Sequence, residues 1–432
     1  MDNARLRAVR ETLKSTISVD TLFSSSAKDS FPEINGDVVI MGGYRGSILR
    51  DAKTRRRVWI PLKVGLNIRK INLELGLTDE DELHASDSII ADGILSHIGP
   101  VDVSRKLMKR LEANPNNTVH DFGYDWRLSG QSMTKSLLIY LKKIRAQRGR
   151  SWKGAVVIAH SMGGLVAHGA MQEDPSLFRG LLYVGSPCSC VNILGPMRYG
   201  ESVLLSNKVL TAQANFTMRS SFLFLPLDGK CFVDKTSGEH IRLDFFDANI
   251  WTKYRLSPCA VSPTTACSTD ADQSSEAEVI PQATSTLDFT EATMYLQHTL
   301  DITKAFQEHL RFDSTKVYPP LAVVYGSNVP TVCGARVNGE HDIFRGDYDD
   351  MRFAAGDGVV VAKNLMPPDG FKLEAKLVSD RGHVGLLSDL TTIGKALTAI
   401  LDEEVCRQSS PPHTLVTAMN AQPHAHTMDI NS

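Results

Sequence analysis

The sequence lacks any apolar run long enough to span a bilayer, and its polar beginning lacks the apolar core of a secretion signal. It also lacks an excess of charge, because 47 Lys and Arg residues are balanced by 49 Asp and Glu residues. Such a balance gives no reason to expect a nucleic-acid partner. We therefore expect an intracellular, cytoplasmic protein with no transmembrane segment and no nucleic-acid partner.

Cysteine is scarce and irregularly placed. The seven cysteines are an odd number, and no pair of them has zinc-ligand spacing. We expect reduced thiols, no metal and no other cofactor. A disulfide between Cys259 and Cys267 stays open for the case that the protein is exported.

Strand and helix patterns alternate along most of the chain. Five short apolar runs indicate buried parallel strands, at 36–43, 118–123, 154–159, 180–185 and 321–326. A sixth run alternates as an edge strand does, at 371–377, and apolar residues at helical spacing occur at 101–111, 132–144 and 386–401. This alternation predicts an α/β protein with a mostly parallel sheet covered by helices on both faces.

One long region breaks the alternation and contains loops, short amphipathic pieces and aromatic side chains. We expect it to be a cap inserted into the sheet domain. Within it, residues 257–286 are dominated by Ser, Thr, Ala, Pro and acidic residues, so we expect a disordered loop. The expected divisions are a polar extension at 1–35, core parts at 36–187 and 320–408, the cap region at 188–319 and a disordered tail at 409–432.

The sharpest local signal is the stretch 159–163, which reads Ala-His-Ser-Met-Gly. In the α/β-hydrolase fold the nucleophile lies in a strained turn between a strand and a helix, with small residues two positions before and after it. Ala159 and Gly163 occupy these positions, although glycine is usual at the first. We therefore predict an α/β-hydrolase fold with Ser161 as the nucleophile. The alternative is a surface serine in an ordinary strand–turn–helix connection.

A serine nucleophile needs a base and an acid, which follow it in the order acid and then histidine in this fold. Asp357 lies between two glycines that let its carboxylate project from a tight turn, and we predict it as the acid. The competing candidates are Asp347, Asp349 and Asp350. His383 lies just after the last predicted strand and before the closing helix, so we predict it as the base.

Acyl transfer also requires donors for the developing oxyanion. We expect one to be the backbone N–H of Met162, immediately after the nucleophile. The other should come from the glycine-rich loop after the first strand, where we expect the N–H of Tyr44, with that of Arg45 as the alternative.

Several of these segments together resemble the lecithin:cholesterol acyltransferase family, which includes phospholipid:diacylglycerol acyltransferases and related lipases. The segments that carry the resemblance are Met41-Gly42-Gly43 with Arg45-Gly46-Ser47, Gly123-Tyr124-Asp125-Trp126-Arg127, Ala159 to Gly164, and Gly356-Asp357-Gly358. The resemblance implies Ser161, Asp357 and His383 as the triad, and a sheet domain with a cap and a mobile lid. The sequence departs from the family pattern at Val359, where threonine is usual.

Residues 51–70 occupy the lid position of such relatives, and their basic stretch next to Trp59 suggests contact with an anionic lipid surface. The alternative is a solvated loop with one packed tryptophan.

The function that we expect is two-step acyl transfer from an ester lipid, with water or an alcohol as acceptor. The alternatives are a soluble carboxylesterase or lactonase acting on small esters, and an inactive hydrolase-like protein that binds a ligand.

Overall fold

The computed structural model describes residues 31–60, 72–98, 100–203, 206–262 and 285–409. Several sequence predictions fall outside these residues in whole or in part. They concern the N-terminal extension up to residue 30, the lid segment from residue 61, most of the loop expected to be disordered, and the tail from residue 410. These stay predictions.

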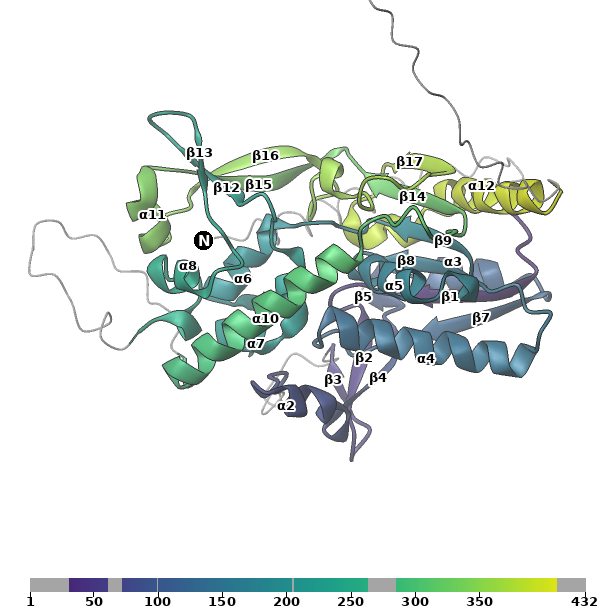
Figure 1. The fold of residues 1–432 in the computed structure, drawn as a ribbon, viewed down its shortest axis with the longest axis horizontal. Helices are drawn as coiled ribbons and strands as arrows, with labels where there is room; N and C mark the ends of the chain where they lie inside the picture. The colour runs from purple at the N-terminus through teal and green to yellow at the C-terminus, as the bar shows by residue number, and fades with distance from the viewer. Residues whose placement is uncertain (1–30, 61–71, 99, 204–205, 263–284, 410–432) are drawn as a thin grey trace, which may run out of the picture.

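Six strands form one parallel sheet (Figure 1). They are β1 (Gly36–Met41), β7 (Asn117–Phe122), β8 (Ala155–His160), β9 (Phe178–Val184), β14 (Leu321–Gly326) and β17 (Ala375–Ser379). Their order is β17-β14-β9-β8-β1-β7, and each neighbouring pair is parallel. The predicted α/β fold with a mostly parallel sheet is therefore confirmed.

The edge strand β17 begins at Ala375, whereas the sequence predicts its start at Phe371. The ring of Phe371 packs edge-on against the rings of Phe312 and Tyr318, with centroid distances of 5.1 and 4.7 Å. Phe371 therefore packs in an aromatic cluster and does not join the sheet. The alternation of polar and apolar residues gives no sign of such a contact.

Helices cover both faces of the sheet, as predicted. They are α3 (Arg105–Glu112), α4 (Gly130–Arg148), α5 (Met162–Glu173) and α12 (Leu390–Ser409). Alternate residues of each strand enter two separate cores, because successive side chains point to opposite faces. Val39 and Val157 lie in one core with residues of α4 and α5, while Val38 and Val156 lie in the other with residues of α3 and α12.

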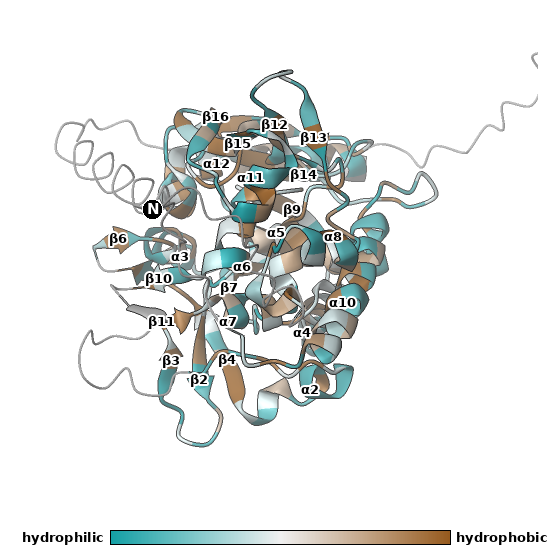
Figure 2. Ribbon diagram, turned by 90° about the vertical axis from the view of Figure 1, so that its left-hand side faces the viewer, coloured by the Kyte–Doolittle hydropathy of each residue, from teal (hydrophilic) through white to brown (hydrophobic). Residues whose placement is uncertain are grey.

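The cap region contains a long helix where the sequence indicated only loops and short amphipathic pieces. Helix α10 (Phe289–His309) begins at Asp288, whose carboxylate accepts hydrogen bonds from the backbone N–H groups of Thr290 and Glu291. In Figure 2 the helix carries both hydrophilic and hydrophobic residues along its length, as expected when only one face is buried. Shorter elements complete the region: α6 (Leu194–Tyr199), β10 (Glu201–Val203), β11 (Ser206–Leu210), α7 (Ala212–Thr217) and α8 (Ala248–Lys253).

A second sheet joins parts of the chain from both sides of residue 320. Its strands are β12 (Lys230–Asp234), β13 (His240–Arg242), β15 (Val329–Val337) and β16 (Asp350–Gly356), and α11 (Gly339–Arg345) lies between the last two. The order is β13-β12-β15-β16, and β12 pairs with β15 in parallel. Because β16 ends directly before Asp357, this sheet leads the chain to the predicted acid.

A small antiparallel sheet follows the turn after β1. Its strands are β2 (Ser47–Asp51), β3 (Arg57–Trp59) and β4 (Ile89–Ile94), and the nearby elements are α2 (Asp79–Leu83), β5 (His97–Ile98) and β6 (Val101–Asp102). Strand β2 lies in the middle, paired with β3 and β4. The turn at residues 42–46 is therefore anchored at both ends by sheets.

Candidate active site

Ser161 lies in the turn between β8 and α5, with backbone angles φ +54° and ψ −129°. A positive φ is unusual for a residue other than glycine and marks a strained position. The two glycines that follow are required by close contacts. A Cβ on Gly163 would lie 2.5 Å from the carbonyl oxygen of Gly42, and one on Gly164 would lie 2.0 Å from the Ser186 hydroxyl oxygen.

The structure brings the three predicted triad residues together from distant segments. The Oγ of Ser161 lies 2.9 Å from Nε2 of His383, and Nδ1 of His383 lies 2.6 Å from Oδ2 of Asp357. All three are buried, with exposed fractions of 7% for Ser161, 8% for His383 and 1% for Asp357. This arrangement allows the imidazole to accept the serine proton while the carboxylate fixes its orientation.

The carboxylate of Asp357 is oriented by its own turn. Its Oδ1 accepts hydrogen bonds from the backbone N–H groups of Val359 and Val360, at 3.0 and 2.8 Å, which leaves Oδ2 for His383. The N–H of His383 also donates to the backbone carbonyl of Asp357 at 2.8 Å. Two of the competing aspartates form ion pairs elsewhere, Asp347 with Arg345 and Asp350 with Arg336.

His160, the residue before the nucleophile, takes part in the site through a hydrogen bond. Its Nε2 donates a hydrogen bond to the backbone carbonyl of His383 at 2.8 Å, and the two imidazole rings lie 5.0 Å apart. Burial and the neighbouring His383 lower the pKa of His160 to about 3, so its ring is neutral near neutral pH. Strand β8 therefore supplies the residue before Ser161 as a support for the loop that carries His383.

The segments expected to donate to the oxyanion both border Ser161. A Cβ on Gly43 would lie 2.4 Å from the Cβ of Ser161, so only glycine allows this approach, and Tyr44 is the next residue. Met162 is the first residue of α5, where backbone N–H groups have no partner within the helix. The roles of the Tyr44 and Met162 amides as donors stay predictions.

The Tyr-Asp-Trp-Arg segment supports the turn that carries Tyr44. The hydroxyl of Tyr124 donates to the carbonyl of Gly42 at 2.7 Å, and the indole N–H of Trp126 donates to the carbonyl of Ser47 at 3.1 Å. Arg127 forms a two-pronged ion pair with Asp125, at 2.9 and 2.6 Å. Arg127 therefore has the structural role of an ion-pair partner.

The same turn is connected to the cap region through two side chains. The Tyr44 hydroxyl shares a hydrogen bond of 2.8 Å with that of Ser221. The guanidinium of Arg45 forms an ion pair with Glu201 of β10 and donates to the side-chain oxygen of Asn215 at 2.6 Å. Any displacement of β10 would therefore act on the turn beside Ser161.

Trp59 is buried in the segment for which a lid was expected. Its indole N–H donates to the carbonyl of Arg45 at 2.8 Å, and its ring packs against that of Trp126. The tryptophan is thus packed against the turn after β1. The expected lipid-surface contact of residues 51–70 stays a prediction.

A family model identifies the family, and one relative matches most of the chain. The family model described as lecithin:cholesterol acyltransferase matches residues 98–331. Uncharacterized protein YJR098C of Saccharomyces cerevisiae (strain ATCC 204508 / S288c) is 43% identical over 462 aligned residues, which cover 94% of this chain and 70% of the yeast protein. The chain belongs to the lecithin:cholesterol acyltransferase family. The part matched by the family model contains Ser161, whereas Asp357 and His383 lie beyond its end.

A comparison with solved structures concerns the fold. A chain of the Tle4-Tli4 complex aligns with a TM-score of 0.51 and 12% identity, covering 87% of this chain and 99% of that chain. At this identity the likeness concerns the fold alone. Together with the parallel sheet and the turn at Ser161, it confirms the α/β-hydrolase fold of this family member.

The described part of the chain contains no helix that is both long and apolar enough to cross a membrane. Cys259 is a free thiol, while Cys267 lies outside the described residues, so the disulfide left open between them is not tested. Within the same residues, no group of three or more His, Cys, Asp or Glu side chains is arranged to hold a metal ion.

Proposed function

We propose that this protein is a serine-dependent lipid esterase or O-acyltransferase that forms an acyl-enzyme at Ser161. The observation that carries the proposal is the continuous hydrogen-bonded series of Asp357, His383 and Ser161, located at a strained turn between a strand and a helix. Membership of the lecithin:cholesterol acyltransferase family supports an ester lipid as the acyl donor.

In the first step, Nε2 of His383 accepts the proton of Ser161 while Oγ attacks the ester carbonyl. The carbonyl oxygen becomes an oxyanion, which the backbone N–H groups of Tyr44 and Met162 would stabilise. The protonated imidazole then gives its proton to the leaving alcohol as the ester bond breaks. Asp357 favours the imidazolium throughout because its carboxylate remains ionised.

In the second step, the acceptor loses its proton to His383 and attacks the acyl-Ser161 carbonyl. The bond between the acyl group and Oγ then breaks, and the imidazolium returns its proton to Oγ, which regenerates Ser161. A water acceptor gives a free fatty acid, and an alcohol acceptor gives a new ester. Both outcomes use the same three side chains, so the acceptor must be identified by analysis of the products.

A fluorophosphonate probe tests the nucleophile directly, because it reacts covalently with an activated serine. We expect labelling at Ser161 in the full chain and none in the Ser161→Ala variant. Folded protein that does not react with the probe would refute an enzymatic function and favour the inactive ligand-binding alternative.

Product analysis tests the substrate class. We expect the wild-type protein to release or transfer acyl chains from phospholipid or neutral-lipid esters, supplied in vesicles with a diacylglycerol or sterol acceptor. Hydrolysis of short-chain p-nitrophenyl esters alone, with no activity on any lipid ester, would favour a soluble carboxylesterase instead.

A further inference from the structure

A strongly basic stretch surrounds the end of α4. Residues 135–153 contain seven Lys and Arg residues and no Asp or Glu. One of them, Arg148, is compensated by Asp37, whose carboxylate accepts from its Nη2 at 2.7 Å and from its Nε at 3.0 Å. The stretch therefore contains no acidic residue of its own that could offset its cations.

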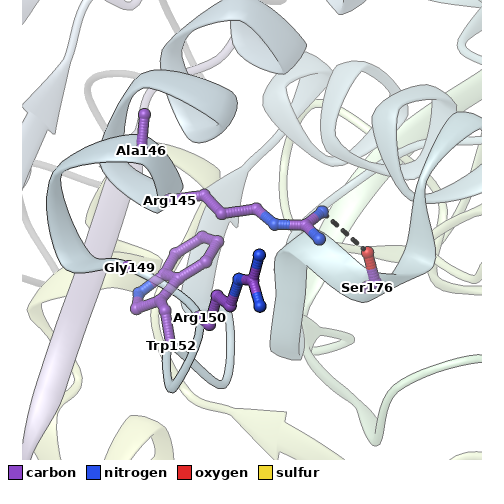
Figure 3. A pocket seen from close by; sticks show the side chains of 6 residues that line it. All are labelled: Arg145, Ala146, Gly149, Arg150, Trp152 and Ser176. Atoms are coloured by element: carbon purple, nitrogen blue, oxygen red, sulfur yellow. Dashed lines mark hydrogen bonds between the residues drawn. The ribbon is translucent and has the colours of Figure 1, made fainter.

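A hollow of about 420 Å³ lies within this stretch. It is lined by Arg145, Ala146, Gly149, Arg150, Trp152 and Ser176. Figure 3 shows the guanidinium groups of Arg145 and Arg150 and the indole of Trp152 around one space, with Ser176 on its far side. Helix α4 ends at this point because Gly149 adopts φ +83°, which brings Arg150 and Trp152 back beside Arg145.

The charges of the two arginines are poorly compensated. Arg145 has an exposed fraction of 56%, and its Nη1 lies 3.9 Å from the carboxylate of Asp174 and 3.5 Å from the hydroxyl of Ser176. Among the described residues, no carboxylate lies within ion-pair distance of Arg150. Two like charges that face one hollow repel each other. An anion placed between them would attract both and so offset the repulsion.

Trp152 gives the hollow a rigid aromatic wall. Its indole N–H donates to Oδ2 of Asp37 at 2.9 Å, which fixes the orientation of the ring. The same carboxylate also binds Arg148 and His120, so the support beneath the ring is itself tightly held.

We propose that this hollow binds a phosphate monoester. The guanidinium forks of Arg145 and Arg150 would hold the phosphate, and the organic part of the ligand would lie against the indole of Trp152. A monoester carries close to two negative charges and three acceptor oxygens, which matches two guanidinium groups better than a single carboxylate does. The phosphate can belong to a soluble metabolite or to a phosphorylated lipid headgroup.

The hollow and Ser161 lie at opposite ends of strand β8. Strand β8 begins at Ala155, three residues after Trp152, and ends immediately before Ser161. Its six residues span about 20 Å at ~3.3 Å per residue. Loss of ligand binding at the hollow should therefore leave the reaction of Ser161 with a fluorophosphonate probe unchanged.

The test compares two double variants of the full chain that remove the same charge. Arg145→Gln with Arg150→Gln removes the guanidinium groups that line the hollow. Lys142→Gln with Lys143→Gln removes two exposed cations of the same helix that do not line it. Calorimetric titration with inorganic phosphate and with inositol trisphosphate should show saturable binding that weakens at least about tenfold in the arginine variant only.

Vesicles distinguish the two sources of phosphate. Sedimentation with phosphatidylcholine vesicles that contain phosphatidylinositol 4-phosphate, but not with those that contain phosphatidylserine, would assign the site to a lipid headgroup. Binding of inositol trisphosphate without binding to vesicles would assign it to a soluble ligand. Equal losses in both double variants would show diffuse charge attraction and overturn the proposal, as would the absence of saturable binding to every probe. Unchanged probe labelling at Ser161 and an unchanged unfolding temperature confirm that the variants are folded.

Discussion

At the residue scale, the strained backbone of Ser161 is fixed by hydrogen bonds on both sides. Its N–H donates to the carbonyl of Val184 at 2.9 Å, and its own carbonyl accepts from the N–H of Gly164 at 2.9 Å. A conformation of this kind persists only where the surrounding structure determines it. The consequence is that the hydroxyl points to His383 before any substrate is present.

The role of Asp357 can be tested with the Asp357→Asn variant. The amide retains the size of the side chain but does not stabilise the imidazolium, so we expect kcat for ester cleavage to fall by about 10⁴-fold. The matched control is Asp350→Asn, which removes a competing aspartate that pairs with Arg336 on the surface. Steady-state kinetics on one ester substrate would measure both, and similar losses in the two variants would contradict the assignment of the acid.

The supporting role of His160 calls for a pair of variants. His160→Phe removes the donor to the carbonyl of His383, and loss of one such hydrogen bond should lower kcat by roughly tenfold with little change in KM. His160→Gln keeps a side-chain donor and should recover part of the activity. If the glutamine variant is no better than the phenylalanine variant, the hydrogen bond is not what positions the base.

Sequence reasoning at this scale found residues that have a chemical type to search for. Ser161, Asp357 and His383 could be proposed because a nucleophile, an acid and a base must follow one another in a fixed order in this fold. The contacts of His160 and Tyr124 could not be predicted, because both side chains bind main-chain carbonyls, of His383 and Gly42 respectively. Any residue type supplies such a carbonyl, so the sequence contains no sign of the partner.

At the element scale, helix α10 shows where the spacing of apolar residues was not enough to predict a helix. Its buried residues are Ala292, Tyr295, Leu296, Thr299, Leu300, Thr303 and Phe306, which follow helical spacing. Two of them are threonines, and these polar residues interrupt the apolar pattern on which the prediction of helices depends. In β8, by contrast, the residues from Ala155 to Ala159 are all apolar and all buried, so the apolar run is uninterrupted.

Helix α10 is held against the sheet domain by a close contact that can be tested. A Cβ added to Gly130 of α4 would lie 2.6 Å from the ring of Phe306, and one added to Gly169 of α5 would lie 3.0 Å from it. We expect Phe306→Ala to lower the free energy of unfolding by about 3–5 kcal/mol, because it leaves a cavity among three helices. The exposed Met294 of the same helix provides the control, and Met294→Ala should change stability by less than about 0.5 kcal/mol in urea unfolding. Equal effects would mean that α10 is not packed as described.

The connection between β10 and the turn after β1 gives a second prediction for elements. Glu201→Gln removes the charge that faces the Arg45 guanidinium, whose side chain is only 10% exposed. An uncompensated buried charge should lower stability by about 3–5 kcal/mol and, because Arg45 adjoins Tyr44, should also slow acylation of Ser161. The surface pair of Asp228 with Lys230 is the control, and Asp228→Asn should cost at most about 1 kcal/mol. Urea unfolding measures the stability, and the rate of probe labelling measures the acylation of Ser161. A loss of stability without slower labelling would mean that β10 does not influence the turn beside Ser161.

At the scale of the whole molecule, the two cores contain residues of the same strands but differ in the helices that pack against them. One combines the sheet with α4, α5 and the aromatic residues of the cap region, while the other combines it with α3, α12 and the turn that contains Leu386 and Leu387. Ser161 follows β8, whose residues enter both cores. Partial unfolding of either core would therefore disturb the distances between Ser161, Asp357 and His383, so stability and activity should change together.

Two buried histidines make this stability depend on pH. Burial lowers the pKa of His160 and of His168 to about 3, from an ordinary value of 6.5. Below about pH 6.5 the unfolded chain binds protons that the folded chain does not, so the free energy of unfolding falls as the pH is lowered towards 3. Each histidine contributes a slope of up to about 1.4 kcal/mol per pH unit in this window. Urea unfolding at several pH values should show a smaller slope in His168→Gln than in the wild type, and an unaltered slope in the exposed control His341→Gln. The same slope in all three proteins would mean that His168 is protonated in the folded state, which its burial against Tyr183 argues against.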